Sequence, residues 1–110
     1  QIYGLAIQGL ALVELGRADE GAEQSARARA LLAEQERLEG AEQILYIHAA
    51  VCTAAGRHDE AVAAIRAARR EMDSKSEQLA DRTLRAIYAE STIPRAIRDL
   101  YQRLVGLAPG

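Results

Sequence analysis

The sequence has little that would build a β-sheet or a disulfide-bonded domain. Among its 110 residues there is no Trp or Phe, and there are two Pro and one Cys. Proline is scarce and β-branched residues form no sustained alternating run, so helix is favoured almost throughout and the expected class is all-α. A single cysteine, Cys52, excludes an internal disulfide, and its place in an apolar stretch predicts a small buried side chain. A reducing cytoplasm fits this composition.

The sequence also has no large excess of either positive or negative charge. The 14 basic and 16 acidic side chains are interspersed and leave a net charge of −2, so no field of one sign attracts nucleic acid or an anionic membrane. Gln8 and Glu14 interrupt the longest apolar run, which falls short of the roughly 20 residues that cross a bilayer. We therefore expect neither nucleic acid nor membrane as a partner of this domain.

What is present is an internal repeat with a period of forty residues. Gly16-Arg17-Ala18-Asp19-Glu20 returns as Gly56-Arg57-His58-Asp59-Glu60, and Leu5, Ile7 and Ala28-Arg29 return as Leu45, Ile47 and Ala68-Arg69. In each copy an apolar run precedes the glycine and an alanine-rich charged run follows it. Each copy is therefore predicted to be an antiparallel helix pair with the glycine at its turn.

The predicted repeats cover residues 1–38 and 41–73, and a degenerate third pair with a capping role covers 76–106. The second helix is expected to run to about Leu38 and the fourth from His58 to Met72. Ser74 and Glu77 have the capping-box form, which predicts a fifth helix from Ser76 to Glu90 after a break at 73–76. Pro94 suits the first turn of a sixth helix, whose apolar stripe consists of Ile93, Ile97, Leu100, Tyr101, Leu104 and Val105.

The first predicted helix, from Ile2 to Leu15, is apolar nearly all round. The second helix of its own pair can cover only one side of it. Either a preceding repeat or another copy of the chain is expected to cover the remainder. Because the sequence opens at Gln1, inside this apolar run and without an initiator methionine, we expect it to be a piece of a longer protein.

The repeated residues resemble the tetratricopeptide repeat (TPR), whose pattern is W-x2-L-G-x2-Y, then A-x3-F, then P. Aligned on the turn glycine, the W, G, Y, A and F places of the second copy hold Leu45, Ala49, Cys52, Ala61 and Ile65. In the first copy they hold Leu5, Gly9, Leu12, Gly21 and Ser25. The chain departs from the family at the usual Leu, where Gln8 and His48 stand, and at the closing Pro, where Ala33 and Asp73 stand. HEAT repeats have a similar length, but the Gly-Arg-x-Asp-Glu turn favours the TPR.

The resemblance implies a right-handed α-solenoid of three helix pairs. Ligands of this family lie in the concave groove lined by the first helix of each pair. Carried over by position, the groove residues are Tyr3, Ile7, Leu10, Gln43, Tyr46, Ile47, Ala50 and Thr53. Such a lining suits an apolar peptide or an amphipathic helix. The alternative is that Ile7, Leu10 and Ile47 simply pack against neighbouring repeats.

Repeats with this period also resemble arrays in large bacterial regulators that couple a nucleotide-hydrolysing module to a cyclase or a LuxR-type DNA-binding domain. The expected function is thus a non-enzymatic protein-interaction scaffold at the C-terminal end of such an array, binding a peptide or another domain of its own chain. Two alternatives stay open. One is self-association through the apolar first helix, and the other is a small-molecule sensor with a pocket near Tyr46 and His48.

No catalytic or metal-binding motif stands out. The chain has no nucleophile elbow, no glycine-rich phosphate loop and no histidine in a recognisable pairing with Ser or Cys. His48 is expected to bond a nearby carbonyl, and His58 to be exposed in the turn. These two histidines are ten residues apart, and neither is expected to have a Cys or acidic partner at ligand spacing. We therefore expect no metal site. No cofactor is expected.

Overall fold

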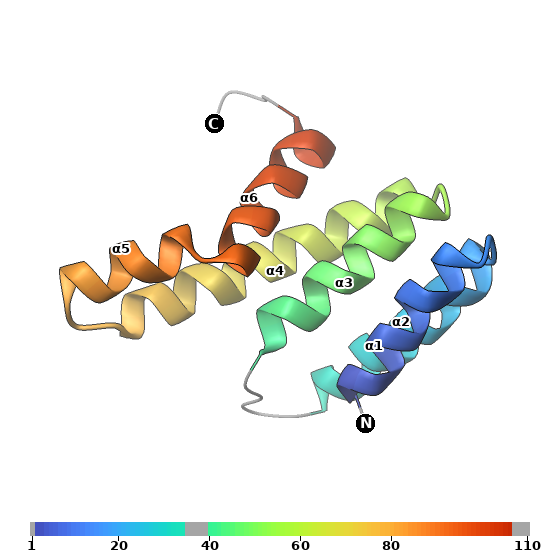
Figure 1. The fold of residues 1–110 in the computed structure, drawn as a ribbon, viewed down its shortest axis with the longest axis horizontal. Coiled ribbons are helices and arrows are strands. Elements are labelled where there is room, and N and C mark those ends of the chain that lie inside the picture. Colours follow the sequence, from blue (N-terminus) through green and yellow to red (C-terminus); the bar gives the residue numbers. More distant parts are fainter. Residues whose placement is uncertain (1, 35–39, 107–110) are drawn as a thin grey trace.

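The computed structural model describes residues 2–34 and 40–106. These residues form six α-helices and no strand, as expected for an all-α chain (Figure 1). The helices are α1 (Ile2–Glu14), α2 (Ala18–Ala33), α3 (Ala41–Ala54), α4 (His58–Gln78), α5 (Arg82–Glu90) and α6 (Thr92–Val105). Within the described part of the chain, no helix is both long and apolar enough to cross a membrane.

The two predicted turns have the same backbone structure. Gly16 and Gly56 follow α1 and α3 with φ of 78° and 75°, a left-handed conformation that glycine adopts without steric cost. Each turn closes with the two hydrogen bonds of a Schellman motif, which satisfy carbonyls at the helix end. The donors and acceptors are Arg17 N to Leu12 O (2.8 Å) and Gly16 N to Val13 O (3.0 Å), then Arg57 N to Cys52 O (2.9 Å) and Gly56 N to Thr53 O (3.1 Å).

Helix packing follows the order of the chain. The helices α1 and α2 pack on each other, as do α3 and α4, while α3 also packs on α2 and α1. The last helix, α6, packs on α4 and α3, whereas α5 contacts α4 and α6 at the end of the molecule away from α1 and α2 (Figure 1). The larger core side chains are Leu32, Ile44, Leu45, Ile47, Val51, Ile65, Met72, Ile97 and Leu100.

The helices α1 and α2 approach each other closely at two glycines that face each other, Gly9 and Gly21. A Cβ added at Gly9 would lie 2.9 Å from the carbonyl oxygen of Gly21, and one added at Gly21 would lie 2.6 Å from that of Gly9. Both distances are too short for a carbon, so the crossing of α1 and α2 requires glycine on both helices. The second pair has Ala49 and Ala61 at the corresponding places, both fully buried.

The predicted break at residues 73–76 is wrong, because α4 continues to Gln78. Neither glycine nor proline occurs between Arg57 and Gln78 to stop it. The predicted capping box at Ser74 and Glu77 therefore lies inside a helix. The fifth helix starts at Arg82 instead, where the Asp81 side chain accepts a 2.7 Å hydrogen bond from the backbone N–H of Thr83.

The other boundaries agree with the prediction to different extents. The described part of α2 ends at Ala33, and Leu38 lies outside the described residues. The apolar stripe of α6 is confirmed: Ile97 and Leu100 are buried and the other stripe residues are partly buried. In contrast, α5 has no buried residue, and Leu84 and Ile87 are 51% and 62% exposed.

Candidate functional site

A buried polar contact joins the two helix pairs. Ser25 of α2 is fully buried, His48 of α3 is 2% exposed, and 2.7 Å separates the Ser25 Oγ from the His48 Nδ1. Both residues stand where the TPR pattern has a large apolar side chain. A small hydroxyl on one helix thus leaves room for an imidazole on the next, and the two departures from the pattern compensate each other.

The hydrogen bonds of Ser25 favour one tautomer of His48. The Ser25 hydroxyl donates to the carbonyl oxygen of Ala22 at 3.2 Å, and a hydroxyl that donates there can accept a proton from Nδ1 of His48 at 2.7 Å. Burial, helped by the positive charges of Arg29 and Arg57, lowers the pKa of His48 to about 4. At neutral pH the imidazole is therefore uncharged, and in the favoured tautomer its lone pair is on Nε2.

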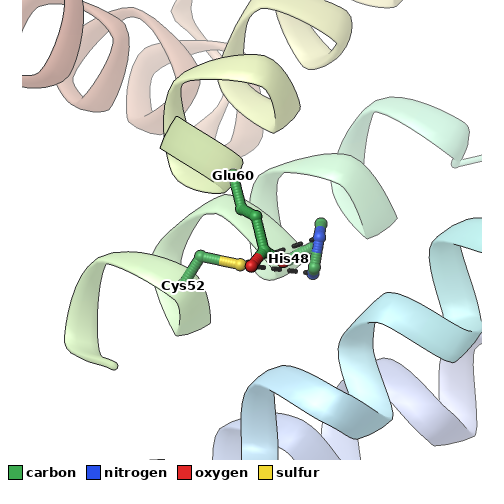
Figure 2. Close-up of side chains that lie close together, drawn as sticks. All are labelled: His48, Cys52 and Glu60. Atoms are coloured by element: carbon green, nitrogen blue, oxygen red, sulfur yellow. Dashed lines mark hydrogen bonds between the residues drawn. The ribbon is translucent and has the colours of Figure 1, made fainter. Parts of the chain in front are cut away.

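Two further side chains lie next to this imidazole. Cys52, one helical turn after His48, places its Sγ 3.7 Å from both ring nitrogens. Glu60 extends from the first turn of α4 towards α3, and its carboxylate lies beside the cysteine sulfur (Figure 2). One ligand atom from each of His48, Cys52 and Glu60 lies within 4.8 Å of the other two. Three helices thus contribute to the cluster of Ser25, His48, Cys52 and Glu60, which we call the junction cluster.

The junction cluster differs from a nucleophilic site. Ser25 and Cys52 are both fully buried, so neither can attack a dissolved substrate in this conformation. Burial and the negative charge of Glu60 raise the pKa of Cys52 to about 11, so the thiol is protonated at neutral pH. The open edge of the cluster is on the Glu60 side, where the side chain is half exposed.

Arg57 links the junction cluster to α2. Its guanidinium lies 3.6 Å from Asp19 and 3.2 Å from Glu23 on α2, and 3.7 Å from Glu60 in the first turn of α4. Because Arg57 faces three carboxylates, its charge is more than balanced locally.

A second polar cluster lies at the other end of α3. Glu42 is 7% exposed, and its carboxylate accepts hydrogen bonds from Lys75 Nζ at 3.1 Å and Tyr88 Oη at 3.0 Å. These bonds connect the start of α3 with the end of α4 and with α5. Burial and Glu42 together raise the pKa of Tyr88, which keeps its hydroxyl protonated and able to donate.

The eight predicted groove residues do not form one exposed surface. Tyr3 and Ile7 are 48% and 40% exposed, Thr53 is exposed, and Ile47 is only 4% exposed. The partly buried ones are Leu10, Gln43, Tyr46 and Ala50. Gln43 Nε2 donates a 3.3 Å hydrogen bond to Tyr3 Oη, which brings α1 and α3 together along this face. For Ile47 the structure shows the alternative interpretation, packing against a neighbouring helix.

Several positions on one side of α1 are exposed, whereas the corresponding positions of α3, forty residues later, are buried. Ile44, Ile47, His48 and Val51 lie on one side of α3 and are buried, and His48 shows that this side faces α2. Forty residues earlier, the corresponding positions are Gly4, Ile7, Gln8 and Ala11, and all four are exposed. We call these four residues the α1 strip. Sequence reasoning expected α1 to need covering, and the strip shows which side is uncovered.

Two expectations about the histidines need correction. His48 bonds the hydroxyl of Ser25 rather than a carbonyl, because the small side chain in α2 leaves a polar atom in reach. The premise that His48 has no cysteine at ligand spacing is wrong, because Cys52 follows it by one turn and Glu60 lies beside both. The signal was in the sequence as H-x3-C on a predicted helix. The expectations that Cys52 is buried and His58 exposed are confirmed.

Comparison with known proteins gives the chain no relative from which a function could be carried over. It matches no family model, no curated protein and no solved structure.

Proposed function

We propose that the chain is a non-enzymatic, TPR-like scaffold that binds another helical segment on the α1 strip. In this proposal α1–α2 and α3–α4 are two copies of one helix pair in a right-handed solenoid, and α6 takes the place of a third first helix. The observation that carries the proposal is that Gly4, Ile7, Gln8 and Ala11 are exposed, whereas their counterparts forty residues later are buried, and one of these, His48, contacts Ser25 of α2.

Equivalent packing in the two pairs supports the repeat. The same Schellman bonds close both turns, and where Gly9 and Gly21 meet in the first pair, the second pair has the small buried residues Ala49 and Ala61. Each later first helix packs on the pair before it: α3 lies on α2 and α1, and α6 lies on α4 and α3. A repeat protein of this kind buries a continuous core only by stacking neighbours, so a first helix with an uncovered side provides a surface for another unit.

The ion pairs of Arg57 and Arg17 indicate which side chains a partner would present to the α1 strip. Arg57 reaches Asp19 and Glu23 on the preceding pair, and its counterpart Arg17 is ion-paired with Glu20 of its own helix. The Arg17 side chain is 54% exposed, compared with 28% for Arg57. By equivalence, the partner is a helix with small residues along one face and carboxylates near its N-terminus. That description fits α2 itself, so the occupant we propose is a further helix pair of this kind.

A chain extended by one repeat tests this proposal. Residues 1–40 are duplicated in front of Gln1, so that the α2 of the added copy can cover the α1 strip of the original. We expect the extended chain to unfold in one cooperative transition and to be more stable than the 110-residue chain, because stacking adds an interface. An added pair that unfolds separately, without changing the stability of the original, would contradict the proposal.

The same substitution in two settings gives a matched control. In the 110-residue chain Ile7→Glu should cost only about 1 kcal/mol, because Ile7 is 40% exposed and just part of its apolar surface is buried. In the original copy within the extended chain it should cost about 2 kcal/mol or more, because it removes buried apolar surface and buries a charge. Equal effects in the two chains would show that nothing covers Ile7.

Light scattering on the unextended chain distinguishes self-association from binding of a different helix pair. The proposal predicts a monomer. A dimer that Ile7→Glu dissociates would favour the homo-oligomer alternative instead.

A further inference from the structure

We propose that His48, Cys52 and Glu60 bind a Zn²⁺ ion at the joint between the two helix pairs. The three side chains come from adjacent turns of α3 and from the first turn of α4, and their ligand atoms lie close together (Figure 2). This site is independent of the α1 strip, which lies on another helix, so its test does not depend on the proposed function.

The ligand atoms are close enough for side-chain rotation to bring them onto one ion. With Zn–S of about 2.3 Å and Zn–N of about 2.0 Å, a sulfur and a nitrogen ligand are about 3.5 Å apart. Cys52 Sγ lies 3.7 Å from both Nδ1 and Nε2 of His48, which places it to one side of the Nε2 lone pair, so the Cys52 side chain must rotate to share an ion with Nε2. The carboxylate of Glu60 completes a group of ligand atoms that all lie within 4.8 Å of one another. Histidine and cysteine four residues apart on one helix face point the same way, so the backbone needs no rearrangement to bring them together.

The hydrogen bonds of Ser25 favour the tautomer of His48 that a metal requires. When the Ser25 oxygen accepts the Nδ1 proton, the Nε2 lone pair is free to bind. A ligand histidine is commonly held in this way by a hydrogen bond to its other nitrogen, which fixes the ring and its tautomer. Ser25 thus acts as a positioning residue. The same buried hydroxyl explains why a polar pair stands where the repeat pattern has two apolar residues.

Charge and proton balance also fit a divalent cation. On binding, the Cys52 thiol releases its proton to solvent and the thiolate bonds the metal, so the site gains one net positive charge. Two positive side chains, Arg29 and Arg57, lie near His48. Asp19, Glu23 and Glu60 surround Arg57 and offset its charge. Glu60 has two carboxylate oxygens, so an ion pair with Arg57 leaves the other oxygen for the metal. A thiolate, an imidazole and a carboxylate together suit Zn²⁺ and disfavour Mg²⁺ and Ca²⁺, which prefer oxygen ligands.

The ion would link α3 to α4 within the second helix pair. The first pair would contribute only the positioning hydroxyl of Ser25 on α2, which holds the imidazole. Three protein ligands leave a fourth position for water or for a ligand from a partner.

Titration of the 110-residue chain with Co²⁺ under reducing conditions tests the site, because a thiolate bound to Co²⁺ gives a charge-transfer absorption band. We expect the band to saturate at one equivalent, to disappear when Zn²⁺ is added, and to be absent in Cys52→Ser. Glu60→Gln alters only a half-exposed side chain and keeps the fold, and it should weaken Co²⁺ binding at least about tenfold. His58→Gln, which changes the exposed histidine at the start of α4, should bind as tightly as the original chain.

Ser25→Ala tests the positioning role separately. It removes the acceptor of the Nδ1 proton, and we expect a loss of Co²⁺ affinity of about 10- to 100-fold while the charge-transfer band keeps its position. Three results would overturn the proposal: no band in the original chain, a band that persists in Cys52→Ser, or unchanged affinity in Glu60→Gln. Circular dichroism of each variant establishes that it is folded before titration.

Discussion

Replacing Gly21 by alanine tests how closely α1 and α2 approach. The new Cβ would lie 2.6 Å from the backbone oxygen of Gly9, and no rotation of a side chain can relieve that contact. The two helices must therefore move apart or tilt. Overpacking of this kind costs about 1–3 kcal/mol, and the contact is short enough to place Gly21→Ala near the upper end. Better helix propensity returns about 1 kcal/mol, so the net expected loss of stability is about 2 kcal/mol.

Gly4 provides the matched control for this substitution. It lies in the same helix as Gly9, but a Cβ there would meet nothing within 4 Å. Gly4→Ala should therefore gain up to about 1 kcal/mol from helix propensity alone. Gly9→Ala, with its Cβ 2.9 Å from the Gly21 oxygen, should be destabilising by less than Gly21→Ala. The double variant Gly9→Ala/Gly21→Ala should cost less than the sum of the two, because one separation of the helices relieves both contacts.

The assay is urea unfolding followed by circular dichroism, with the free energies of unfolding compared at equal slope. The reasoning predicts that Gly4→Ala and Gly21→Ala change stability in opposite directions and differ by about 2–3 kcal/mol. If Gly21→Ala is as stable as Gly4→Ala, then α1 and α2 do not cross at these glycines.

Three further predictions concern the polar groups. Burial lowers the pKa of His48 from 6.5 to about 4, so between these pH values the unfolded chain binds a proton that the folded chain does not. In the presence of a chelator, the free energy of unfolding should therefore fall by about 3 kcal/mol as pH falls from about 6.5 to about 4. The His48→Leu variant should lose much less stability over the same pH range. Glu42→Gln should lower the free energy of unfolding by about 1 kcal/mol, because it removes the charge that the Lys75 ammonium contacts. Urea unfolding at low and high salt should show that the stability difference between the variant and the original chain becomes smaller as salt is added. Asp81→Ala removes the N-cap of α5 and should speed amide hydrogen exchange in that helix about fivefold, equivalent to about 1 kcal/mol, while leaving exchange in α3 unchanged.

The sequence predicted those parts of the fold where local chemistry decides the outcome. The turns at Gly16 and Gly56 could be placed because a positive φ at a helix end nearly requires glycine. The α6 stripe could be placed because its apolar residues recur at helical spacing next to a proline in the first turn. In both cases the deciding interactions lie within a few residues of one another.

Where tertiary contacts decide, the sequence was less informative. Ser74 and Glu77 have the form of a helix start, but Met72 is buried and Lys75 contacts Glu42, and both hold the chain in α4 beyond the predicted break. Likewise, the pairing of Ser25 with His48 depends on how α2 lies against α3. Its only sequence signal was that both residues depart from an apolar place in the repeat.

The α1 strip illustrates how repeat and structure complement each other. Sequence alone indicated that the first helix is too apolar to be exposed all round, but not which side is free. Comparing Ile7 with Ile47, 40% and 4% exposed, identifies that side, because the two residues hold the same place in the repeat and differ only in what covers them. The same comparison shows that Ile47, one of the predicted groove residues, is buried.

A crystal structure of the 110-residue chain would test most directly whether residues 2–78 are two copies of one helix pair. We predict that one rotation and translation carries α1–α2 onto α3–α4, that the same operation places α3 near α6, and that Ile7 is exposed while Ile47 is buried. A closed bundle, with α5 and α6 folded back over α1 and with Leu5 and Leu45 in different surroundings, would contradict the account.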